Sequence, residues 1–240
     1  MDFKSNIHSH THYCDGKGRV RDYIITALEK GFKSYGISTH NPIANDVNWE
    51  MAEADFEAYL NDIEESQREF GNQIEIYKGL EVDYFDDIDK PNAWLDRLDY
   101  WIGSIHFIDR DLNGNRWEID GSTQLFNQGL QSIYRGDIKK VIGRYFDLTI
   151  SMIKEWNPPV IGHLDKIKIH NSKAFFFNAR EEWYLNKVSK VLECAKAHNS
   201  IIEVNTRGIY KGITVEPYPS WSILEMIKKQ DIPIILNSDS

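Results

Sequence analysis

The chain reads Val160-Ile161-Gly162-His163 over residues 160–163, a short apolar run that ends on a histidine. Pro158 and Pro159 come directly before this run, and they stop the helical pattern that precedes it because proline cannot continue a helix. A short apolar run bounded in this way is typical of a buried strand. The histidine therefore stands at the carboxyl end of a predicted strand.

The same arrangement recurs along the chain, where short apolar runs alternate with longer segments of helical period. This alternation predicts parallel βαβ units, and right-handed crossovers would close such a sheet into a barrel or leave it doubly wound. The sequence shows no internal repeat or linker-like stretch, so we expect one α/β domain over residues 1–240. The expected strands are 3–7, 35–38, 74–77, 100–105, 160–162, 201–204 and 232–236, and the main expected helices are 20–30, 49–70, 137–156, 181–198 and 221–229.

A histidine, glutamate or aspartate follows six of the seven expected strands. The carboxyl ends of parallel strands meet at one edge of a sheet or barrel, so we expect these side chains to converge. Two of the histidines stand at i and i+2 of an extended segment, which places both on one side. Imidazole and carboxylate ligands suit Zn²⁺, Mn²⁺ or Fe²⁺. The residues are His8, His10, His40, Glu81, His106, His163 and Asp239.

The composition argues against several classes of protein. The chain has 28 Lys and Arg residues against 37 Asp and Glu, a net charge of −9 that disfavours nucleic-acid binding. No apolar run approaches the ~18 residues of a membrane span, and no signal-peptide pattern opens the chain. The two cysteines, Cys14 and Cys194, fit a reducing compartment. We therefore expect a cytoplasmic protein, with neither nucleic acid nor membrane as a partner.

Four further segments accompany the candidate ligands. They are His106-Phe107-Ile108, Trp117-Glu118-Ile119-Asp120-Gly121, Gly162-His163-Leu164-Asp165-Lys166-Ile167 and Glu203-Val204-Asn205-Thr206. With these segments the chain resembles the PHP (polymerase and histidinol phosphatase) superfamily, and within it the bacterial histidinol-phosphatases, over essentially its whole length. The His-x-His opening is shared with amidohydrolases, whereas the ordered set of residues and the last two segments are more specific.

The resemblance implies a distorted (β/α)7 barrel that holds two or three divalent metal ions (Zn, Mn or Fe). The family continues Asp-x-His after its seventh strand, and this sequence ends at Asp239-Ser240. We therefore expect a barrel truncated at its carboxyl end, without the final helix. By position, the first ion would be held by His8, His10, Glu81 and Asp239, the second by Glu81 as a bridge with His106 and His163, and a third would involve Asp15 and His40.

The activity implied by the resemblance is hydrolysis of L-histidinol phosphate to L-histidinol and phosphate, in histidine biosynthesis. A hydroxide held between metal ions would attack phosphorus, with Glu81 and Asp239 as the catalytic carboxylates. A phosphate dianion also calls for a cation, and Arg207 lies just past the sixth strand, with Lys168 as a weaker candidate. Asp165 would either orient a ligand imidazole or cap a helix.

Other interpretations remain open at this point. A phosphoesterase of the same family could act on another small phosphate monoester, such as a nucleoside monophosphate. A metal-binding domain of this family could also lack catalysis. A metal-dependent amidohydrolase is disfavoured, because it would carry a Lys or an extra His on the fourth strand and no Glu after the third.

Overall fold

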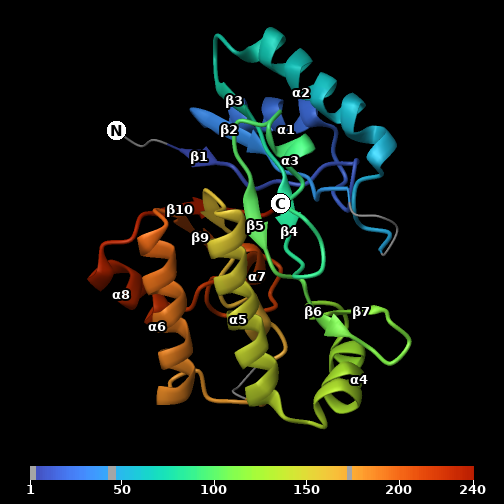
Figure 1. Ribbon diagram of the computed structural model, residues 1–240. Coiled ribbons are helices and arrows are strands. Elements are labelled where there is room, and N and C mark those ends of the chain that lie inside the picture. Colours follow the sequence, from blue (N-terminus) through green and yellow to red (C-terminus); the bar gives the residue numbers. More distant parts are fainter. Residues whose placement is uncertain (1–3, 43–46, 172–174) are drawn as a thin grey trace. The chain divides into compact units, whose positions relative to one another are not determined.

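The protein is described here by a computed structural model, in which residues 4–42, 47–171 and 175–240 are placed (Figure 1). The chain folds into two compact units that interleave along the sequence. The first unit comprises the chain up to Val82, together with Pro91–Ile102 and Leu236–Ser240. The second comprises Asp83–Lys90 and Gly103–Ile235. None of the helices within the placed residues is long and apolar enough to cross a membrane.

The first unit contains a sheet of three short parallel strands. Strand β2 (Ser34–Ile37) lies in the middle, between β1 (Ser5–Asn6) and β3 (Glu75–Lys78). Ser34 is in register with Ser5 on one side and with Glu75 on the other. The helices of this unit are α1 (Val20–Glu29), α2 (Phe56–Phe70), which follows the 3-10 turn η1 (Glu53–Asp55), and α3 (Asn92–Leu95).

Helix α1 shows how the local sequence sets the helices of this unit. Val20, Ile24 and Ala27 are buried, and their spacing of four and three residues places them on one face. The predicted stop at Gly31 is confirmed, because Gly31 has a φ of 76° directly after the helix. Glycine takes this left-handed conformation at no steric cost and commonly ends helices.

Two tyrosine hydroxyls link the strand ends of the first unit. The Tyr59 hydroxyl lies 3.0 Å from the carbonyl oxygen of Ile37 and 2.6 Å from that of Gly79, at the ends of β2 and β3. The Tyr100 hydroxyl donates to the carbonyl oxygen of Ile7 at 2.5 Å. A Cβ atom at Gly79 would come within 2.3 Å of the Tyr100 ring, so this position requires glycine. These contacts fix the ends of the strands, where the candidate ligands begin.

The second unit holds the core of a five-stranded sheet with the order β10-β9-β8-β5-β4. Its β8 (Val160–Ile161) and β9 (Ile201–Asn205) run parallel, with Val160 opposite Ile201. The division between the units passes through β4 (Glu81–Asp83), β5 (Ile102–Ser104) and β10 (Ile234–Asn237). A separate antiparallel hairpin pairs β6 (Phe107–Arg110) with β7 (Arg116–Glu118).

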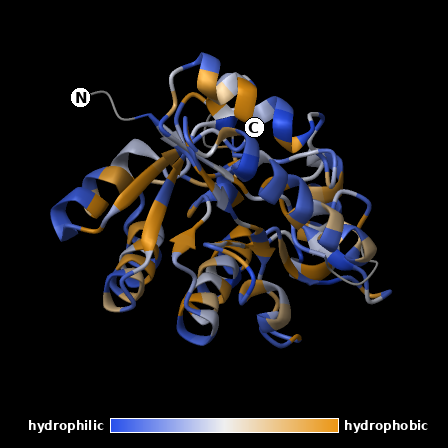
Figure 2. Ribbon diagram, turned by 90° about the horizontal axis from the view of Figure 1, so that it is seen from above, coloured by the Kyte–Doolittle hydropathy of each residue, from blue (hydrophilic) through white to orange (hydrophobic). Residues whose placement is uncertain are grey.

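Helix α5 (Ile138–Trp156) packs against α6 (Glu182–Ala197) in the second unit. The Asp137 side chain caps α5 by accepting a hydrogen bond from the backbone N–H of Lys140 at 3.2 Å. Figure 2 shows hydrophobic and hydrophilic residues alternating along the helices, as expected where one face of a helix is buried. The remaining elements of the unit are α4 (Thr123–Tyr134), η2 (Lys166–Lys168), α7 (Arg207–Tyr210) and α8 (Trp221–Gln230).

The prediction of a mixed α/β fold is confirmed, and the long helices lie close to their expected ranges, except that the helix expected over 49–70 begins only at Phe56. The elements that the sequence analysis missed include the β6–β7 hairpin, helices α4 and α7, and strand β4, which follows β3 after two residues. Hydrogen bonds within the placed residues sort the strands into sheets of three, five and two strands. They do not show the closed ring of a (β/α)7 barrel, so the barrel and the single domain stay predictions.

Candidate metal centre

The first unit buries a group of imidazole and carboxylate side chains, which we call the first cluster. Its members stand at strand ends: two follow β1, one follows β2, one begins β4 and one follows β10. Each of them is at most 7% exposed. The members are His8, His10, His40, Glu81 and Asp239.

Glu81 faces three imidazoles of the first cluster. Its Oε2 atom lies 3.1 Å from Nε2 of His8 and 3.3 Å from Nε2 of His10. The same oxygen is 3.3 Å from Nδ1 of His40. The backbone N–H of Asn41 donates to the carbonyl oxygen of Glu81 at 2.9 Å, which holds the start of β4 beside the end of β2. A single carboxylate oxygen is therefore shared among side chains from two strand ends.

The His-x-His segment directs both of its rings to one point. The Nε2 atoms of His8 and His10 are 3.2 Å apart, and Nε2 of His10 lies 3.2 Å from Oδ1 of Asp239. Ser9 points elsewhere, because its hydroxyl donates to the carbonyl oxygen of Gly36 at 2.8 Å. The prediction that these two histidines share one side of an extended segment is confirmed.

Backbone hydrogen bonds hold Asp239 against this segment. The N–H of Asp239 donates to the carbonyl oxygen of His8 at 3.0 Å, and the N–H of His10 donates to that of Ser240 at 2.7 Å. Asp239 has a φ of 53°, in the left-handed region that non-glycine residues adopt infrequently. Such conformations cluster at functional sites, where the surrounding structure enforces them.

The donor atoms of the first cluster fit a divalent metal ion. Burial by itself would lower the pKa of His10, but hydrogen bonds with Asp239, Cys14 and Glu81 raise it well above its ordinary value. This direction means that the site attracts positive charge. Metal–nitrogen and metal–oxygen bonds of about 2.0–2.2 Å allow donors within 4.8 Å of one another to share an ion. Two such triplets are His8, His10 and Asp239, and His10, His40 and Glu81.

Asp15 and Cys14 lie on the other side of the His10 ring. Oδ1 of Asp15 is 3.5 Å from Nδ1 of His10, whereas the rest of the first cluster faces Nε2. Sγ of Cys14 is also 3.5 Å from this Nδ1 atom and 3.4 Å from Oδ1 of Asp15. The three groups lie close enough together to hold a metal ion. Asp15 is partly exposed. The proximity of Cys14 was not foreseen, since its spacing to the histidines matches no thiolate-ligand motif.

The second unit contains a smaller group, which we call the second cluster: His106, His163 and Asp83. The Nε2 atoms of His106 and His163 lie 3.2 Å apart, and all three side chains are buried. Nδ1 of His106 is 2.7 Å from Oδ1 of Asp83, and the backbone N–H of His106 donates to the same oxygen at 3.3 Å. With its proton directed at Asp83, the His106 ring can offer Nε2 as a metal ligand.

Asp83 is a residue that the sequence analysis missed. A signal was present, because Asp83 stands two residues after Glu81, just as His10 stands two residues after His8. Strand β4 was not foreseen, however, and without it the side chain of Asp83 had no predicted direction.

The two candidate phosphate-binding residues lie in different surroundings. Nζ of Lys168 is buried among internal partners, at 2.9 Å from Oδ2 of Asp165 and 3.3 Å from Oε1 of Glu216. Arg207 begins α7 directly after β9, and its backbone N–H donates to Oδ1 of Asn205 at 3.0 Å. The substrate-binding role of both residues stays a prediction.

The contacts of the Asp165 carboxylate match neither of its predicted roles, which were to orient a ligand imidazole or to cap a helix. It stands before η2 without a capping hydrogen bond from its side chain. Oδ2 of Asp165 instead accepts from the backbone N–H of Ser220 at 3.0 Å and lies beside Lys168. Burial raises the pKa of Asp165 despite the nearby ammonium. The carboxylate thus joins the loop after β8 to the start of α8.

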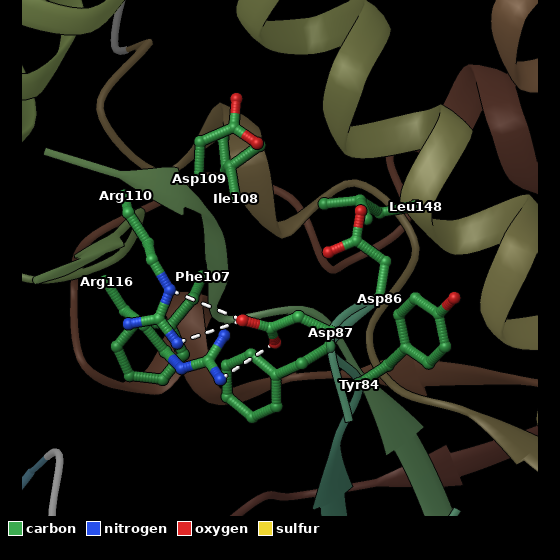
Figure 3. A pocket seen from close by; sticks show the side chains of 10 residues that line it. Tyr84, Asp86, Asp87, Phe107, Ile108, Asp109, Arg110, Arg116 and Leu148 are labelled. Atoms are coloured by element: carbon green, nitrogen blue, oxygen red, sulfur yellow. Dashed lines mark hydrogen bonds and ion pairs between the residues drawn. The ribbon is translucent and has the colours of Figure 1, made fainter. Parts of the chain in front are cut away.

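A pocket in the second unit contains charged side chains that pair with each other, and we call it the paired pocket (Figure 3). Its volume is about 260 Å³. Oδ2 of Asp87 accepts from Nη2 of Arg110 at 3.0 Å, and Oδ1 of Asp87 accepts from Nη2 of Arg116 at 2.9 Å. The Arg116 guanidinium also lies 3.6 Å from the centre of the Phe85 ring. These groups hold the hairpin β6–β7 to the segment after β4.

The chain is similar to a known protein family and to several of its members. The family model described as the PHP domain matches residues 6–207. The chain is 27% identical to a probable histidinol-phosphatase of Schizosaccharomyces pombe, in a match that covers 100% of this chain and 80% of the relative. It is also 27% identical to a histidinol-phosphatase of Bacillus subtilis, with coverage of 99% and 93%.

Two solved structures share the fold. A Listeria monocytogenes protein, provisionally assigned as a histidinol phosphatase, matches with a TM-score of 0.87 and 23% identity, over 99% of this chain and 95% of that one. The histidinol phosphate phosphatase of Lactococcus lactis, solved with zinc, L-histidinol and phosphate, matches with a TM-score of 0.77 and 19% identity, over 99% and 86%.

Proposed function

Since the chain belongs to the PHP family, we propose that it is a metal-dependent phosphatase whose substrate is L-histidinol phosphate. The observation that carries this proposal is the first cluster, in which buried imidazoles and carboxylates from separate strand ends converge within metal-binding distance of one another. The curated relatives that match the whole chain add the substrate, since they bear the histidinol-phosphatase name.

The two clusters contain most of the residues that we propose as metal ligands. A bound divalent ion would lower the pKa of a water molecule and neutralise charge on the phosphoryl oxygens. We propose three ligand groups as predicted from the sequence, with Glu81 also bridging to the second; the third rests on the sequence prediction alone, because the structure places Asp15 beside His10 and His40 beside Glu81. The groups are His8, His10, Glu81 and Asp239; His106 and His163; and Asp15 with His40.

Hydrolysis of the ester forms a bond from a water oxygen to phosphorus and breaks the bond from phosphorus to the alcohol oxygen. The alcohol leaves with one proton and inorganic phosphate with the others. In this proposal, Oε2 of Glu81 and Oδ1 of Asp239, which lie beside imidazole nitrogens, would accept a proton from the attacking water. This role corresponds to the catalytic assignment predicted from the sequence.

Two further residues support the reaction in this proposal. Asp83 positions His106 by accepting a hydrogen bond from Nδ1–H, which leaves the Nε2 lone pair for the metal. Arg207, at the carboxyl end of β9, supplies a guanidinium that can pair with two phosphoryl oxygens. Lys168 is the weaker candidate for phosphate binding, because its ammonium is already held by Asp165 and Glu216.

The test is the release of inorganic phosphate from L-histidinol phosphate by protein supplied with Mn²⁺ or Zn²⁺. We expect kcat/KM to be far higher than for p-nitrophenyl phosphate or AMP. Activity on those esters alone would keep the metal-dependent phosphatase and assign it another small monoester. Bound metal without phosphate release from any of the esters would contradict the proposal and favour a non-catalytic metal-binding domain.

A further inference from the structure

The second unit contains another pocket, which we call the aromatic pocket. Its volume is about 660 Å³, within the range of about 300–1,000 Å³ that is typical of small-molecule sites. It lies where the loop after β7 and the start of α4 meet the segment after η2. The lining residues that matter below are Asp120, Thr123, His170, Phe175 and Phe176.

Two phenylalanine rings form one wall of the aromatic pocket. Phe175 is 78% exposed, although its side chain is large and apolar. Its ring is perpendicular to that of Phe176, with centroids 4.8 Å apart. Phe176 in turn packs edge-on against the buried Phe126 at 5.5 Å. An aromatic ring exposed at the wall of a pocket can take a flat ring or a cation on its face.

The charged lining residue of the aromatic pocket is Asp120. Its Oδ2 atom lies 3.4 Å from Nζ of Lys166, and the side chain keeps 16% of its surface exposed. Burial by itself would raise the pKa of Asp120, but the charge of Lys166, with smaller contributions from His106 and His163, lowers it below the ordinary value. The backbone N–H of Ile119, the residue before Asp120, donates to the carbonyl oxygen of His106 at 2.8 Å, so Asp120 lies close to the second cluster along the chain fold.

His170 adds a neutral polar group to the lining. Its Nδ1 atom is 3.1 Å from the hydroxyl oxygen of Thr123, and its ring lies on that of Phe126 at 4.7 Å. Burial lowers the pKa of His170, so the imidazole carries no charge at neutral pH. Within the placed part of the chain, its Nε2 atom is buried and has no hydrogen-bond partner. A ligand that supplies such a partner would relieve this cost.

We infer that the aromatic pocket binds the organic part of the substrate and selects a compact nitrogen-containing cation, with Asp120 pairing with its charge and Phe175 covering it. This inference rests on the proposed function, and it adds which residues set the specificity. An imidazole-bearing amino alcohol fits these groups, because its positive charge matches Asp120 and its ring matches the phenylalanine wall. An ester of an uncharged alcohol offers the pocket none of these contacts.

The test compares two phosphate monoesters, L-histidinol phosphate and glycerol phosphate, by the ratio of their kcat/KM values. In Asp120→Asn we expect this ratio to fall by about 10-fold or more, since hydrogen bonds to charged groups contribute about 1.5–3 kcal/mol. In Phe175→Ala we expect a fall of about 2- to 5-fold, as for an exposed cation–π contact. The matched control is Asp147→Asn on α5, whose carboxylate is 60% exposed and pairs with Lys187. The control should leave the ratio unchanged.

Metal content is measured for every variant, so that loss of an ion is not mistaken for loss of specificity. Equal falls for both esters in Asp120→Asn, or an unchanged ratio in both pocket variants, would overturn the inference. If the wild-type protein hydrolyses neither ester, the proposed function fails, and calorimetry with L-histidinol on the metal-loaded protein then tests the pocket alone. Binding that weakens in Asp120→Asn and Phe175→Ala would support the pocket. Absence of binding, or equal binding by all variants, would contradict it.

Discussion

Carboxylates have different partners in the first cluster and in the paired pocket. In the paired pocket, Asp87 accepts hydrogen bonds from Arg110 and Arg116, so the charge on the carboxylate is balanced by permanent cations. In the first cluster, the partners of Glu81 and Asp239 are imidazole nitrogens, which are neutral unless they bind a proton. The paired pocket is also partly exposed, whereas the first cluster is buried.

This difference separates a structural arrangement from a ligand-binding one. Guanidinium and carboxylate satisfy each other, so the paired pocket gains little from an added ion. Buried carboxylates beside imidazoles favour positive charge, which a bound proton supplies when no metal is present, as the raised pKa of His10 indicates. A divalent ion would supply this charge and accept the nitrogen lone pairs together. The comparison therefore predicts that changes to the first cluster act through metal, whereas changes to the paired pocket act through local ion pairs.

Removal of metal should give the largest effect. Chelation of the wild-type protein is expected to abolish phosphatase activity and to lower Tm by several degrees. An ion present at 100 times its Kd adds about 2.7 kcal/mol to the free energy of unfolding, and this contribution disappears with the ion. Activity assays and thermal unfolding before and after addition of Zn²⁺ or Mn²⁺ would check this. Full activity in protein that elemental analysis shows to be metal-free would refute the assignment.

The substitution Glu81→Ala should have the second-largest effect on activity. The variant removes the oxygen that faces His8, His10 and His40, so we expect loss of bound metal and a fall in kcat/KM of at least about 10³-fold, equivalent to about 4 kcal/mol. Elemental analysis with phosphate-release kinetics measures both quantities. Glu57→Gln, at an exposed glutamate that pairs with Arg97, is the control that should change neither. Unchanged metal content in Glu81→Ala would rule out Glu81 as a ligand.

Asp83→Asn should have a smaller effect in the second cluster. The variant keeps the shape of the side chain but loses the charge that fixes the proton on Nδ1 of His106. Carboxylates that orient ligand histidines typically contribute 10- to 100-fold to metal affinity or activity. We expect a loss in that range, with metal affinity measured by competition against a chelating dye. A loss of activity at unchanged metal affinity would mean that Asp83 acts by another route.

The fold was predictable where the signal is local. Helix α1 could be placed because Val20, Ile24 and Ala27 repeat at helical spacing and Gly31 follows. Helix α4 was missed because Phe126 and Leu130 are its large buried residues, and the glutamines around them resemble a loop. The β6–β7 hairpin was missed for a similar reason, since Arg110 and Arg116 interrupt the apolar pattern.

The site was predictable to the extent that it depends on strand ends. His8, His10, Glu81 and Asp239 could be grouped because the carboxyl ends of neighbouring strands meet, whatever the loops do. The position of Asp83 depends on the direction of strand β4. This strand has three residues, too few to show a periodic pattern from which it could be predicted. Local sequence also says nothing of tertiary ion pairs such as those of Lys168, which joins Asp165 and Glu216 across the fold of the second unit.

The smallest effect is expected for Asp87→Asn in the paired pocket. Burial by itself would raise the pKa of Asp87, but hydrogen bonds from Arg110 and Arg116 lower it below the ordinary value. A carboxylate with a lowered pKa adds stability above the pKa of the unfolded chain, about 3.9, and loses that contribution as the pH falls through its folded pKa. The side chain is 46% exposed, so solvent screening keeps the contribution small.

Wild type and Asp87→Asn should therefore differ slightly in the free energy of unfolding at pH 7, by an amount that is constant down to about pH 5. Below about pH 4 the difference should shrink and vanish, because the wild-type carboxylate is then protonated as well. Urea unfolding at pH steps from 7 to 3, with metal content held constant, measures this difference. Kinetic constants for the phosphate ester should be the same in both proteins. A change in metal content at pH 7, or a difference in stability that does not shrink as the pH falls from 5 to 3, would show that the paired pocket does more than balance its own charges.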